Sequence, residues 1–572
     1  MGGSLEACAR ASRLPASPPE GTKEASSFRK YSGMNAPQVQ RGRAPPARPL
    51  CRAPPPGQSA RNESNNRQGG AMLRGQMMDM PLSIPRIIDF AAEVHADREV
   101  ISATVEGGRH AYTYADAARR VARAAHALRA LGVAQGDRVA TLAWNGYRHF
   151  ELYFAISGIG AVCHTINPRL FDEQVVYIAN HAQDRLIFTD LTFLPKLATL
   201  LPRLPEGLRV VALCAPEDLP ADSGIPGLLS YEALLGRQPE HIDWPVLDEW
   251  TASSLCYTSG TTGMPKGALY SHRSTLLHAF AEILGTWHCF GPESRILPVV
   301  PLFHVNAWGL PYAAPLAGSA LVFPGPRLDG ASLWRLIDAE RVTVGLGVPT
   351  VWQGLLDEMR RRGVAPGTLR RLVIGGSAAA RPLIAALEGE FGIEVIHAWG
   401  MTEMSPLGTA NQFGEWPEPG TTASLDAKAS AGRRIFSVDM RIVDDSGTPQ
   451  PHDGVARGEL QVRGPTVISG YYENPQATAA VLDGGWFRTG DVARIHPSGD
   501  LEIVDRTKDL IKSGGEWISS IEIEAIAASH PGVAHAACVA VPHPHWDERP
   551  VLVVVKADGA APDRDTLLAH VA

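Results

Sequence analysis

The sequence predicts an α/β fold divided into two or three domains, and three observations support this. The chain has 572 residues, too many for one hydrophobic core. Short apolar runs alternate with helical segments, which is typical of helices layered on buried strands. After about residue 505, charge, glycine and a change of hydrophobic period coincide, which indicates a domain boundary.

The first 71 residues differ from the rest of the chain. They are rich in proline, arginine, serine and glycine and show no hydrophobic period, as in Ala44–Pro49 and Asn62–Asn66. Such a segment cannot bury enough apolar surface to offset the entropy of ordering. We therefore predict a disordered leader over 1–71 and a folded chain that begins near Met72.

The elements of the large region follow from hydrophobic period and capping signals. Thr113-x-x-Asp116 predicts a capping box, and the helix that it starts should end at Gly132. Buried strands are predicted at five apolar runs: Arg138–Leu142, Arg185–Thr189, Arg209–Leu213, Arg371–Ile374 and Glu394–Ile396. The fourth run opens into a glycine turn, Gly375–Ala378, before a helix over Arg381–Phe391. Turns of this kind commonly hold ligands in α/β sheets.

The last part of the chain begins at a charged run. A strand at Leu501–Val504 leads into Asp505–Asp509, and we place the domain boundary there. Beyond it the sequence predicts a helix, two strands and the start of another helix: Ile521–Ala528, Ala536–Val541, Val551–Lys556 and the residues from Asp563.

Composition excludes several classes of function. The formal net charge of -7 offers no concentrated basic surface for nucleic acid. The seven cysteines form no C-x-x-C pair and favour reduced thiols in the cytoplasm. No signal peptide is evident, and the uncharged stretch Ile296–Pro326 contains prolines that disfavour a membrane helix. We predict a cytoplasmic protein without nucleic-acid or integral membrane contact, and a bent pocket wall over Ile296–Pro326.

The stretch Tyr257–Gly267 combines three kinds of anion-binding group. Its glycines leave backbone N–H groups open to a ligand, its hydroxyls add donors, and Lys266 adds a positive charge. It is not a Walker A loop, because the spacing from Gly260 to Lys266 differs and Gly267 takes the Ser/Thr position. The composition favours a phosphate clamp, with an exposed Gly/Thr turn as the alternative.

Six motifs follow one another along the chain: Tyr257–Gly267, Pro301–His304, Trp399–Glu403, Gly458–Tyr472, Trp486–Asp491 and Asp505–Asp509. In this order they resemble the adenylate-forming (AMP-binding) superfamily of acyl-CoA synthetases, luciferases and peptide-synthetase adenylation domains. The resemblance covers about Met72 to Ala572. It implies a large multi-subdomain N-terminal AMP-binding domain over 72–505 and a small, mobile, incomplete α+β C-terminal domain over 506–572.

Four segments carry a narrower resemblance: Leu73–Met78, Cys163–Leu170, Phe303–Gly309 and Lys512–Ile518. They are similar to bacterial medium-chain fatty acyl-CoA ligases and 3-methylmercaptopropionyl-CoA ligases. This implies that a medium- or long-chain fatty acid, or a similar aliphatic acid such as 3-methylmercaptopropionate, attacks the α-phosphate of ATP. CoA then takes the acyl group from acyl-AMP, and AMP and pyrophosphate are released. ATP, Mg²⁺ and CoA are the implied cofactors, and a homodimer is compatible with the resemblance.

The resemblance also assigns site residues. Catalytic roles are expected for Lys266, His304, Thr402 and Glu403, and Mg²⁺ is expected at Thr258 and Glu403. Nucleotide and CoA contacts are expected at a larger set: Thr258, Ser259, Gly260, Thr261, Thr262, Gly263, Gly376, Ser377, Ala378, Trp399, Gly400, Met401, Asp491, Arg506, Lys508, Gly514 and Gly515. Among these, Lys508 matches the hinge about which the small domain rotates between half-reactions.

The residues alone leave plainer alternatives open. Trp399 or His304 can belong to the core, and Glu403 can be a solvated loop carboxylate. Asp491 can be a turn residue, and Arg506 can form a surface ion pair. The acyl pocket is open as well, because seven residues can line an apolar slot or belong to the core: Val305, Ala307, Trp308, Gly309, Val348, Pro349 and Trp352.

Family members continue into a final segment whose Gly-Lys lysine reaches the active site during adenylation. The sequence to Ala572 contains no match, and Lys556 is in a strand context. We therefore expect weak adenylation by the chain as written, while acyl-AMP still reacts with CoA. Two other functions stay open: a catalytically weak nucleotide- or acyl-AMP-binding protein, and transfer of the acyl group to a carrier protein.

Overall fold

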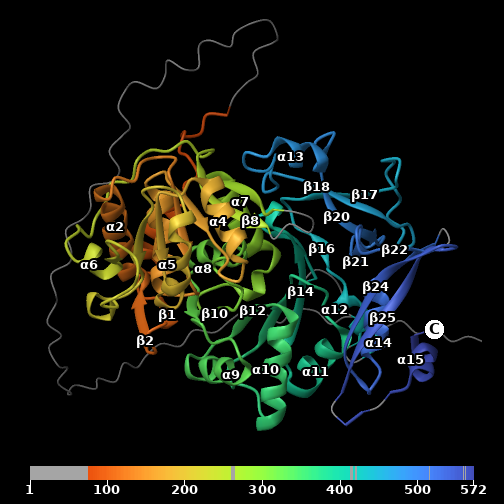
Figure 1. The fold of residues 1–572 in the computed structure, drawn as a ribbon. Coiled ribbons are helices and arrows are strands. Elements are labelled where there is room, and N and C mark those ends of the chain that lie inside the picture. Colours follow the sequence, from red (N-terminus) through yellow and green to blue (C-terminus); the bar gives the residue numbers. More distant parts are fainter. Residues whose placement is uncertain are drawn as a thin grey trace, which may run out of the picture. The chain divides into compact units, whose positions relative to one another are not determined.

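The structure is a computed structural model that describes residues 75–258, 264–411, 417–418, 421–513, 516–557, 559–560 and 562–571. The predicted leader 1–71 lies outside the described residues. Residues Asp79–Ala572 form one compact unit, and Figure 1 labels many of its helices and strands.

Among the described residues, nine strands form a mixed sheet in the order β16-β15-β14-β13-β12-β10-β11-β1-β2. The strands from β14 to β1 are parallel, and both edges are antiparallel. Their bounds are β16 Arg433–Arg434, β15 Leu407–Ala410, β14 Glu394–Gly400, β13 Arg371–Ile374, β12 Val344–Gly347, β10 Arg295–Pro298, β11 Ala320–Phe323, β1 Glu99–Ala103 and β2 Arg109–Thr113.

A second sheet in the described part of the chain has seven strands in the order β7-β6-β5-β3-β4-β8-β9. It is parallel except for the antiparallel pair of β8 and β9. The bounds are β7 Leu229–Ser230, β6 Arg209–Ala212, β5 Leu186–Thr189, β3 Arg138–Leu142, β4 Val162–Thr165, β8 Ala252–Thr258 and β9 Lys266–Ser271.

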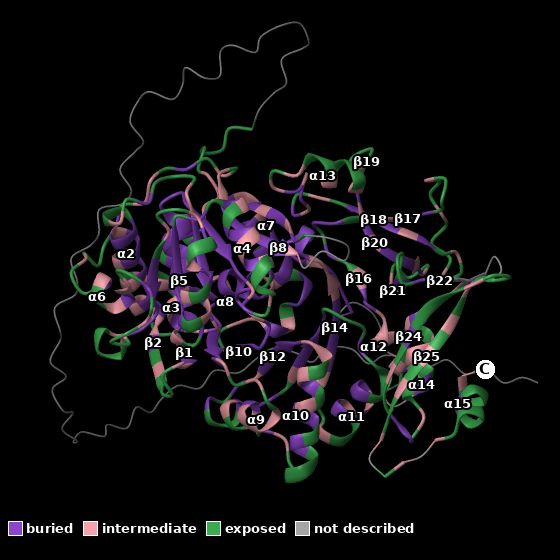
Figure 2. Ribbon diagram, in the orientation of Figure 1, coloured by how far each residue is buried: buried purple, intermediate pink, exposed green. Residues whose placement is uncertain are grey.

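Successive side chains of each central strand point to opposite faces of the sheet, and they are apolar on both faces. Helices therefore cover both faces of these two sheets. One face of the nine-stranded sheet packs against α9 (Gly330–Ala339), α10 (Pro349–Arg362) and α11 (Arg381–Phe391). Between the two sheets lie α1 (Pro85–Val94), α2 (Tyr114–Ala130), α3 (Tyr147–Gly158), α7 (His272–Gly285) and α8 (Leu310–Ala317). Helices α4 (Asp172–Ala182) and α5 (Leu194–Leu200) cover the outer face of the seven-stranded sheet. Figure 2 shows that the strands at the centre of these layers are buried.

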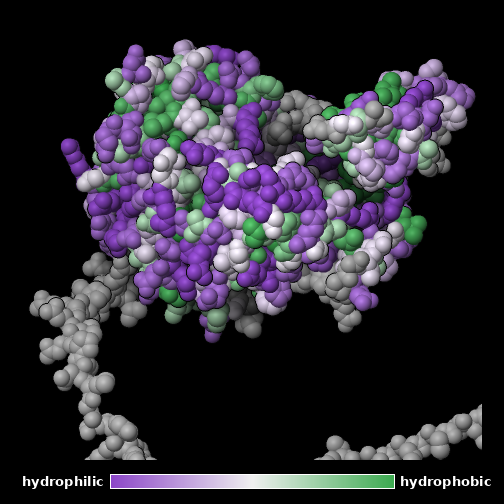
Figure 3. All heavy atoms as spheres, turned by 90° about the horizontal axis from the view of Figure 1, so that it is seen from below, coloured by the Kyte–Doolittle hydropathy of each residue, from purple (hydrophilic) through white to green (hydrophobic). Residues whose placement is uncertain are grey.

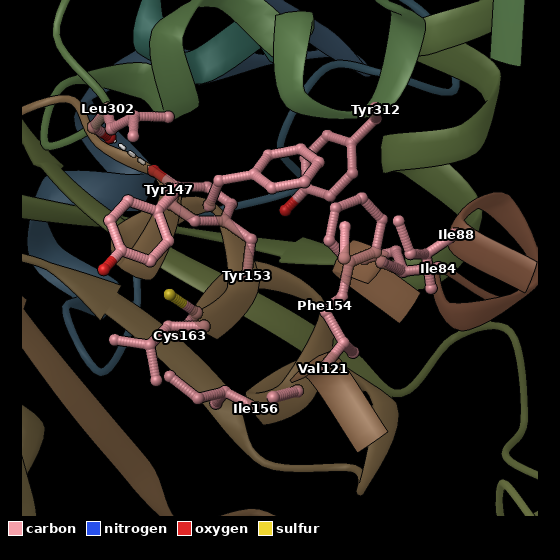
Figure 4. Close-up of a cluster of buried hydrophobic side chains, with 14 of the residues drawn as sticks. Ile84, Ile88, Val121, Tyr147, Tyr153, Phe154, Ile156, Cys163, Leu302 and Tyr312 are labelled. Atoms are coloured by element: carbon pink, nitrogen blue, oxygen red, sulfur yellow. Dashed lines mark hydrogen bonds between the residues drawn. The ribbon is translucent and has the colours of Figure 1, made fainter. Parts of the chain in front are cut away.

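Aromatic side chains fill the space between the two sheets (Figure 4). Tyr153 and Phe154 of α3 lie beside Tyr312 of α8, with ring centroids 5.9 and 5.7 Å from the Tyr312 centroid. The hydroxyl of Tyr153 donates a hydrogen bond to the carbonyl oxygen of Leu302. The core therefore fixes the backbone two residues before His304.

Two antiparallel sheets follow along the chain. The first contains β17 (Asp439–Val443), β18 (Gly458–Arg463), β19 (Leu482–Asp483), β20 (Trp486–Ile495) and β21 (Leu501–Arg506). The second contains β22 (Ile511–Ser513), β23 (Glu516–Ile518), β24 (Val533–His543) and β25 (Asp547–Lys556), with α14 (Ser520–Ala528) and α15 (Arg564–Val571) beside it. The remaining helices are α6 (Tyr231–Leu235), α12 (Thr422–Ala429) and α13 (Pro475–Val481).

Most of the predicted elements are confirmed. The Thr113 hydroxyl accepts the Asp116 N–H at 3.2 Å, and the Asp116 carboxylate accepts the Thr113 N–H at 3.0 Å, which forms the predicted capping box of α2. The helix ends before Gly132, which has φ +80°. The two predicted strands of the last sheet are longer than expected, because β24 and β25 pair along their whole length.

The uncharged stretch Ile296–Pro326 is bent, as expected. It contains β10, a short 3-10 turn at Val305–Gly309, α8 and β11, and most of its side chains are buried. Within the described ranges, no helix has the length and apolar character needed to span a bilayer. Hydrophilic side chains cover most of the face seen in Figure 3, and hydrophobic ones are scattered among them.

Candidate active site

A cavity of about 650 Å³ lies where the ends of several strands meet. Its wall includes the facing ends of β8 and β9, the turns after β13 and β14, and residues of β20 and β21. Ligands commonly bind at strand ends in α/β proteins, because the loops there bring distant residues together.

The hairpin of β8 and β9 supplies two side chains to this wall. Thr258 ends β8, Lys266 begins β9, and the two residues are paired across the hairpin. The Nζ atom of Lys266 lies 5.2 Å from the centroid of the Tyr471 ring. The connecting residues that the sequence predicts as phosphate ligands lie outside the described residues: Ser259, Gly260, Thr261, Thr262 and Gly263.

Thr402 and Glu403 follow β14 in a short 3-10 turn, and both line the cavity. The hydroxyl of Tyr471 donates a hydrogen bond to Glu403 Oε1 at 2.7 Å, and Tyr270 donates to the Thr402 carbonyl at 2.6 Å. Burial raises the pKa of Glu403, and the Tyr471 hydrogen bond with the charge of Lys266 opposes that rise. Glu403 is therefore a buried carboxyl held beside a cation, and the alternative of a solvated loop residue is wrong.

Asp491 of β20 is buried and has two protein partners. Trp399 Nε1 donates to one carboxylate oxygen at 3.1 Å, and Arg506 Nε lies 2.9 Å from the other. Burial raises the pKa of Asp491 to about 6, while Arg506 and Trp399 favour the ionised form. The Arg506 side chain is about half exposed and lines the cavity, so its ion pair joins the cavity wall to the buried Asp491.

Two glycines let the backbone approach the cavity closely. A Cβ at Gly375 would lie 2.9 Å from the Trp308 ring and 3.0 Å from the Ala398 carbonyl oxygen. A Cβ at Gly400 would lie 2.1 Å from the Pro406 carbonyl oxygen. Side chains are excluded at both positions, which leaves flat backbone surface at the turns after β13 and β14.

His304 lies on the wall just before a strained segment. Burial of the imidazole lowers the pKa of His304 and favours its neutral form. Val305, Asn306, Ala307 and Trp308 then have φ values of 43°, 55°, 47° and 59°, a conformation that non-glycine residues rarely adopt. Asn306 anchors the segment by donating to Ser254 Oγ at 2.7 Å. The turn brings Val305 and Trp308 to the cavity.

The end of β21 joins the cavity to the last sheet. Lys508 lines the cavity, and its Nζ atom lies 3.8 Å from Asp509 Oδ2. The Asp505 carboxylate accepts the N–H groups of Arg506 at 2.7 Å and Ser520 at 2.6 Å, which ties β21 to the start of α14. Gly514 and Gly515 lie outside the described residues.

The cavity brings together most of the predicted site that the structure describes: Thr258, Lys266, His304, Gly376, Trp399, Gly400, Met401, Thr402, Glu403, Arg506 and Lys508. Asp491 lies behind the wall and reaches it through Trp399 and Arg506. Ser377 and Ala378 continue the exposed turn after Gly376 and are not part of the wall. Of the residues proposed for an acyl slot, Trp352 is fully buried in the core beneath the nine-stranded sheet.

The sequence assigned no site role to several wall residues, among them Tyr471, Glu282 and Thr286. Tyr471 stands in a motif that carried the resemblance, but its hydroxyl had no assigned partner. Glu282 and Thr286, at the end of α7 and just after it, had no signal at all, because a single acid and a single threonine in a helical segment are common.

The chain matches the model of the AMP-binding enzyme family over residues 88–472. It belongs to this family. Residues 522–572 match the C-terminal domain of AMP-binding enzymes. The predicted resemblance to adenylate-forming enzymes is confirmed, as is the α/β fold with a large N-terminal and a small C-terminal domain.

Curated AMP-binding relatives are similar over most of their length. A 3-methylmercaptopropionyl-CoA ligase from Ruegeria pomeroyi is 50% identical over 503 residues, covering 87% of this chain and 92% of the relative. A medium-chain-fatty-acid–CoA ligase from Ectopseudomonas oleovorans is 47% identical over 486 residues, covering 85% and 88%. The solved structure of an anthranilate CoA ligase with anthranoyl-AMP has a TM-score of 0.76 at 23% identity, covering 86% of this chain and 90% of that one.

Proposed function

We propose that this AMP-binding enzyme is an ATP-dependent acyl-CoA ligase that activates a medium- or long-chain aliphatic acid through acyl-AMP. Its relatives at 46–50% identity are named as CoA ligases for fatty acids and for 3-methylmercaptopropionate. The observation that carries the proposal is the composition of one cavity. Charged and hydroxyl groups, among them Lys266 and Glu403, share its wall with the apolar side chains of Val305 and Trp308.

The nucleotide is assigned to the charged part of the wall. Lys266 and Thr258 bind the phosphates that leave as pyrophosphate, and Thr402 binds the α-phosphate. Trp399 and the glycine turn at Gly376 enclose the adenine. Asp491, already oriented by Trp399 and Arg506, keeps further lone pairs for the ribose hydroxyls.

The donor set fits Mg²⁺. A carboxylate and a hydroxyl, from Glu403 and Thr258, are hard oxygen ligands of the type that Mg²⁺ uses together with substrate phosphates. Tyr471 bonds to Oε1 of Glu403, which orients the carboxylate and leaves Oε2 outside that bond. When bound, Mg²⁺ neutralises phosphate charge.

The acyl substrate is assigned to the wall that follows His304. There the lining is mostly apolar: Val305, Trp308, Leu346, Val373, Ala398, Pro406 and Leu407. The substrate carboxylate lies near His304, and one of its oxygens attacks the α-phosphorus of ATP while pyrophosphate leaves. The CoA thiol then attacks the acyl carbon, the carbon–oxygen bond to phosphate breaks, and AMP leaves. The protein supplies position and charge compensation, and no protein nucleophile is required.

Several further predictions remain proposals. The domain boundaries are kept at 72–505 and 506–572, supported by the end of β21 at Arg506, with rotation about Lys508 between the half-reactions. Cytoplasmic location is supported by Cys163, Cys214, Cys256, Cys289 and Cys538, which are buried and unbridged. A homodimer is proposed from the resemblance alone, and light scattering of the purified protein tests it.

A second substrate, 3-methylmercaptopropionate, is favoured by the 50% identity to the Ruegeria pomeroyi ligase. This acid is shorter than a medium-chain fatty acid and carries a thioether in place of a methylene. Both substrates fit the same mechanism, so they differ only in how the distal wall of the cavity receives the acyl chain.

A carboxylate panel tests the proposal. The purified chain is given CoA, ATP and Mg²⁺ with each straight-chain acid from acetate to palmitate, with 3-methylmercaptopropionate and with an aryl acid, and AMP is quantified. Preformed acyl-AMP with CoA reports the second half-reaction separately. We expect AMP formation to be highest with aliphatic acids. No activity with any aliphatic acid in either assay contradicts the proposal.

A further inference from the structure

The cavity wall contains a carboxyl group that the proposed reaction does not use. Glu282 lies on α7 and lines the cavity, yet only 4% of the residue is exposed. Among the described residues, nothing hydrogen bonds to its buried Oε2 atom. A buried polar atom without a partner costs free energy, so its retention needs a reason.

Within the described part of the chain, Glu282 forms no ion pair. His278, one helical turn earlier, accepts the N–H of Leu407 at its Nε2 atom at 3.0 Å. Burial lowers the pKa of His278 to about 3, so its ring is neutral. Burial also raises the pKa of Glu282 well above its usual value, and no charged group among the described residues opposes that rise. Burial therefore favours the protonated form of Glu282, which can both donate and accept a hydrogen bond.

The backbone is shaped to leave room beside this carboxyl. Gly309 has φ +89°, and a Cβ there would lie 2.9 Å from Glu282 Oε2 and 2.7 Å from His278 Nδ1. Any other residue at 309 would therefore displace the carboxyl. The strained turn at Val305–Trp308 leads directly into this glycine.

Thr286 is the second polar group at this end of the cavity. It is buried and lines the wall, and its hydroxyl donates to the Glu282 carbonyl at 2.8 Å. That bond uses the only hydroxyl hydrogen, so the Thr286 oxygen can act toward a ligand only as an acceptor. Glu282 and Thr286 together offer one donor and several acceptors within a wall that also includes the apolar side chains of Trp308, Leu346 and Leu407.

We propose that Glu282 and Thr286 form a polar distal subsite that selects aliphatic acids carrying a neutral hydrogen-bonding group on the acyl chain, with a hydroxyl as the best match. A hydroxyl accepts from the Glu282 carboxyl and donates to Thr286, whereas a thioether accepts only weakly and a methyl group leaves both residues unpaired. A site built to bond a substrate hydroxyl discriminates strongly against the analogue that lacks it. This inference rests on the proposed ligase function and narrows its substrate class.

The test compares kcat/KM for matched pairs of acids. Each straight-chain acid from butanoate to dodecanoate is paired with the ω-hydroxy acid of equal chain length, and AMP formation is measured. The wild-type protein should prefer the hydroxy acid at one or two adjacent chain lengths, where the hydroxyl reaches Glu282. A plain-acid preference at every length overturns the subsite without touching the ligase proposal, whereas no AMP from any acid in either series refutes the ligase function itself.

Substitutions at Glu282 and Thr286 test whether these residues cause the preference for the hydroxy acid. Glu282→Leu should lower the ratio of kcat/KM for the hydroxy acid over the plain acid by about 10-fold or more at that length. Glu282→Gln keeps a neutral group that donates and accepts, so the ratio should stay near that of the wild type, and Thr286→Val should lower it less. Glu358→Gln is the matched control, because Glu358 is paired with Arg361 and Arg362 away from the cavity. An unchanged ratio in both Glu282→Leu and Thr286→Val contradicts the proposal.

Discussion

The buried carboxyl groups at the two ends of the cavity differ in their hydrogen-bond and ion-pair partners. At the nucleotide end, Asp491 is bonded by Trp399 and Arg506, and Glu403 is bonded by Tyr471 beside Lys266. At the acyl end, Glu282 has no described partner at Oε2 and no counter-ion. The hydrogen bonds and cations beside Asp491 and Glu403 favour the ionised form of each carboxyl group, whereas burial without such a partner favours the protonated form of Glu282. The role of a buried carboxyl group therefore depends on its partners as well as on its burial.

The largest expected effect comes from removing charge at the nucleotide end. Lys266→Met should slow AMP formation from acid, ATP and CoA by about 100-fold or more, because the lysine compensates phosphate charge during adenylation. The reaction of preformed acyl-AMP with CoA should change far less, because pyrophosphate has already left. Rates of the two half-reactions, measured separately, check this.

The control for this variant is Lys556→Met, which removes an exposed lysine at the end of β25. It should leave both half-reactions near the wild-type rates. Equal losses in the two half-reactions of Lys266→Met would show that Lys266 supports the fold or the CoA step and would remove it from the phosphate site.

A smaller effect is expected at the ribose position. Asp491→Asn should raise the KM for ATP by about 10-fold, because hydrogen bonds to a charged acceptor are stronger than those to an amide. The folded pKa of Asp491 is raised from 3.8 to about 6, so its ionised form is lost as pH falls through that value. The wild-type KM for ATP should therefore rise between about pH 7.5 and about pH 5.5, and the Asp491→Asn variant should lack that rise.

The groups that face Asp491 are Arg506, Trp399 and, at longer range, Glu403. A KM for ATP that is independent of pH in the wild type, or an identical rise in the variant, contradicts the assignment of Asp491 to the nucleotide.

The smallest effect concerns stability at the acyl end. Glu282→Leu should raise the free energy of unfolding by about 1 kcal/mol, because the folded protein no longer buries the Oε2 atom, which lacks a hydrogen-bond partner among the described residues. Urea unfolding followed by circular dichroism, compared with Glu282→Gln, measures this. A decrease of about 3 kcal/mol or more in the free energy of unfolding would indicate that Glu282 is paired in the folded protein. Glu282 would then resemble Asp491 and Glu403, and the proposed difference between the two ends of the cavity would be wrong.

The fold was predictable where one local rule decides the structure. The capping box at Thr113 and Asp116 and the apolar run at Arg371–Ile374 formed as expected, since local hydrogen bonding and strand burial agree there. The lengths of β24 and β25 were not predictable, because the two strands pair with each other beyond the apolar run of each.

The site residues also fall into two groups, those that the sequence indicated and those that only the structure reveals. Lys266, Thr402 and Glu403 stand in motifs, so the resemblance indicated them before their geometry was known. Glu282 became visible only when α7 was placed beside Gly309 and Leu407, residues with no sequence signal that connects them to it. The φ values of Val305–Trp308 are equally hidden, because none of these residues is a glycine.

The central claim is that a carboxylate oxygen attacks the α-phosphorus of ATP within this cavity. Octanoate labelled with ¹⁸O in both carboxyl oxygens, incubated with the protein, ATP and CoA, tests it by mass spectrometry of the nucleotide product. We expect AMP carrying one ¹⁸O atom, because the bridging oxygen stays with phosphorus when the CoA thiol displaces AMP. Unlabelled AMP, or ADP as the nucleotide product, would contradict it.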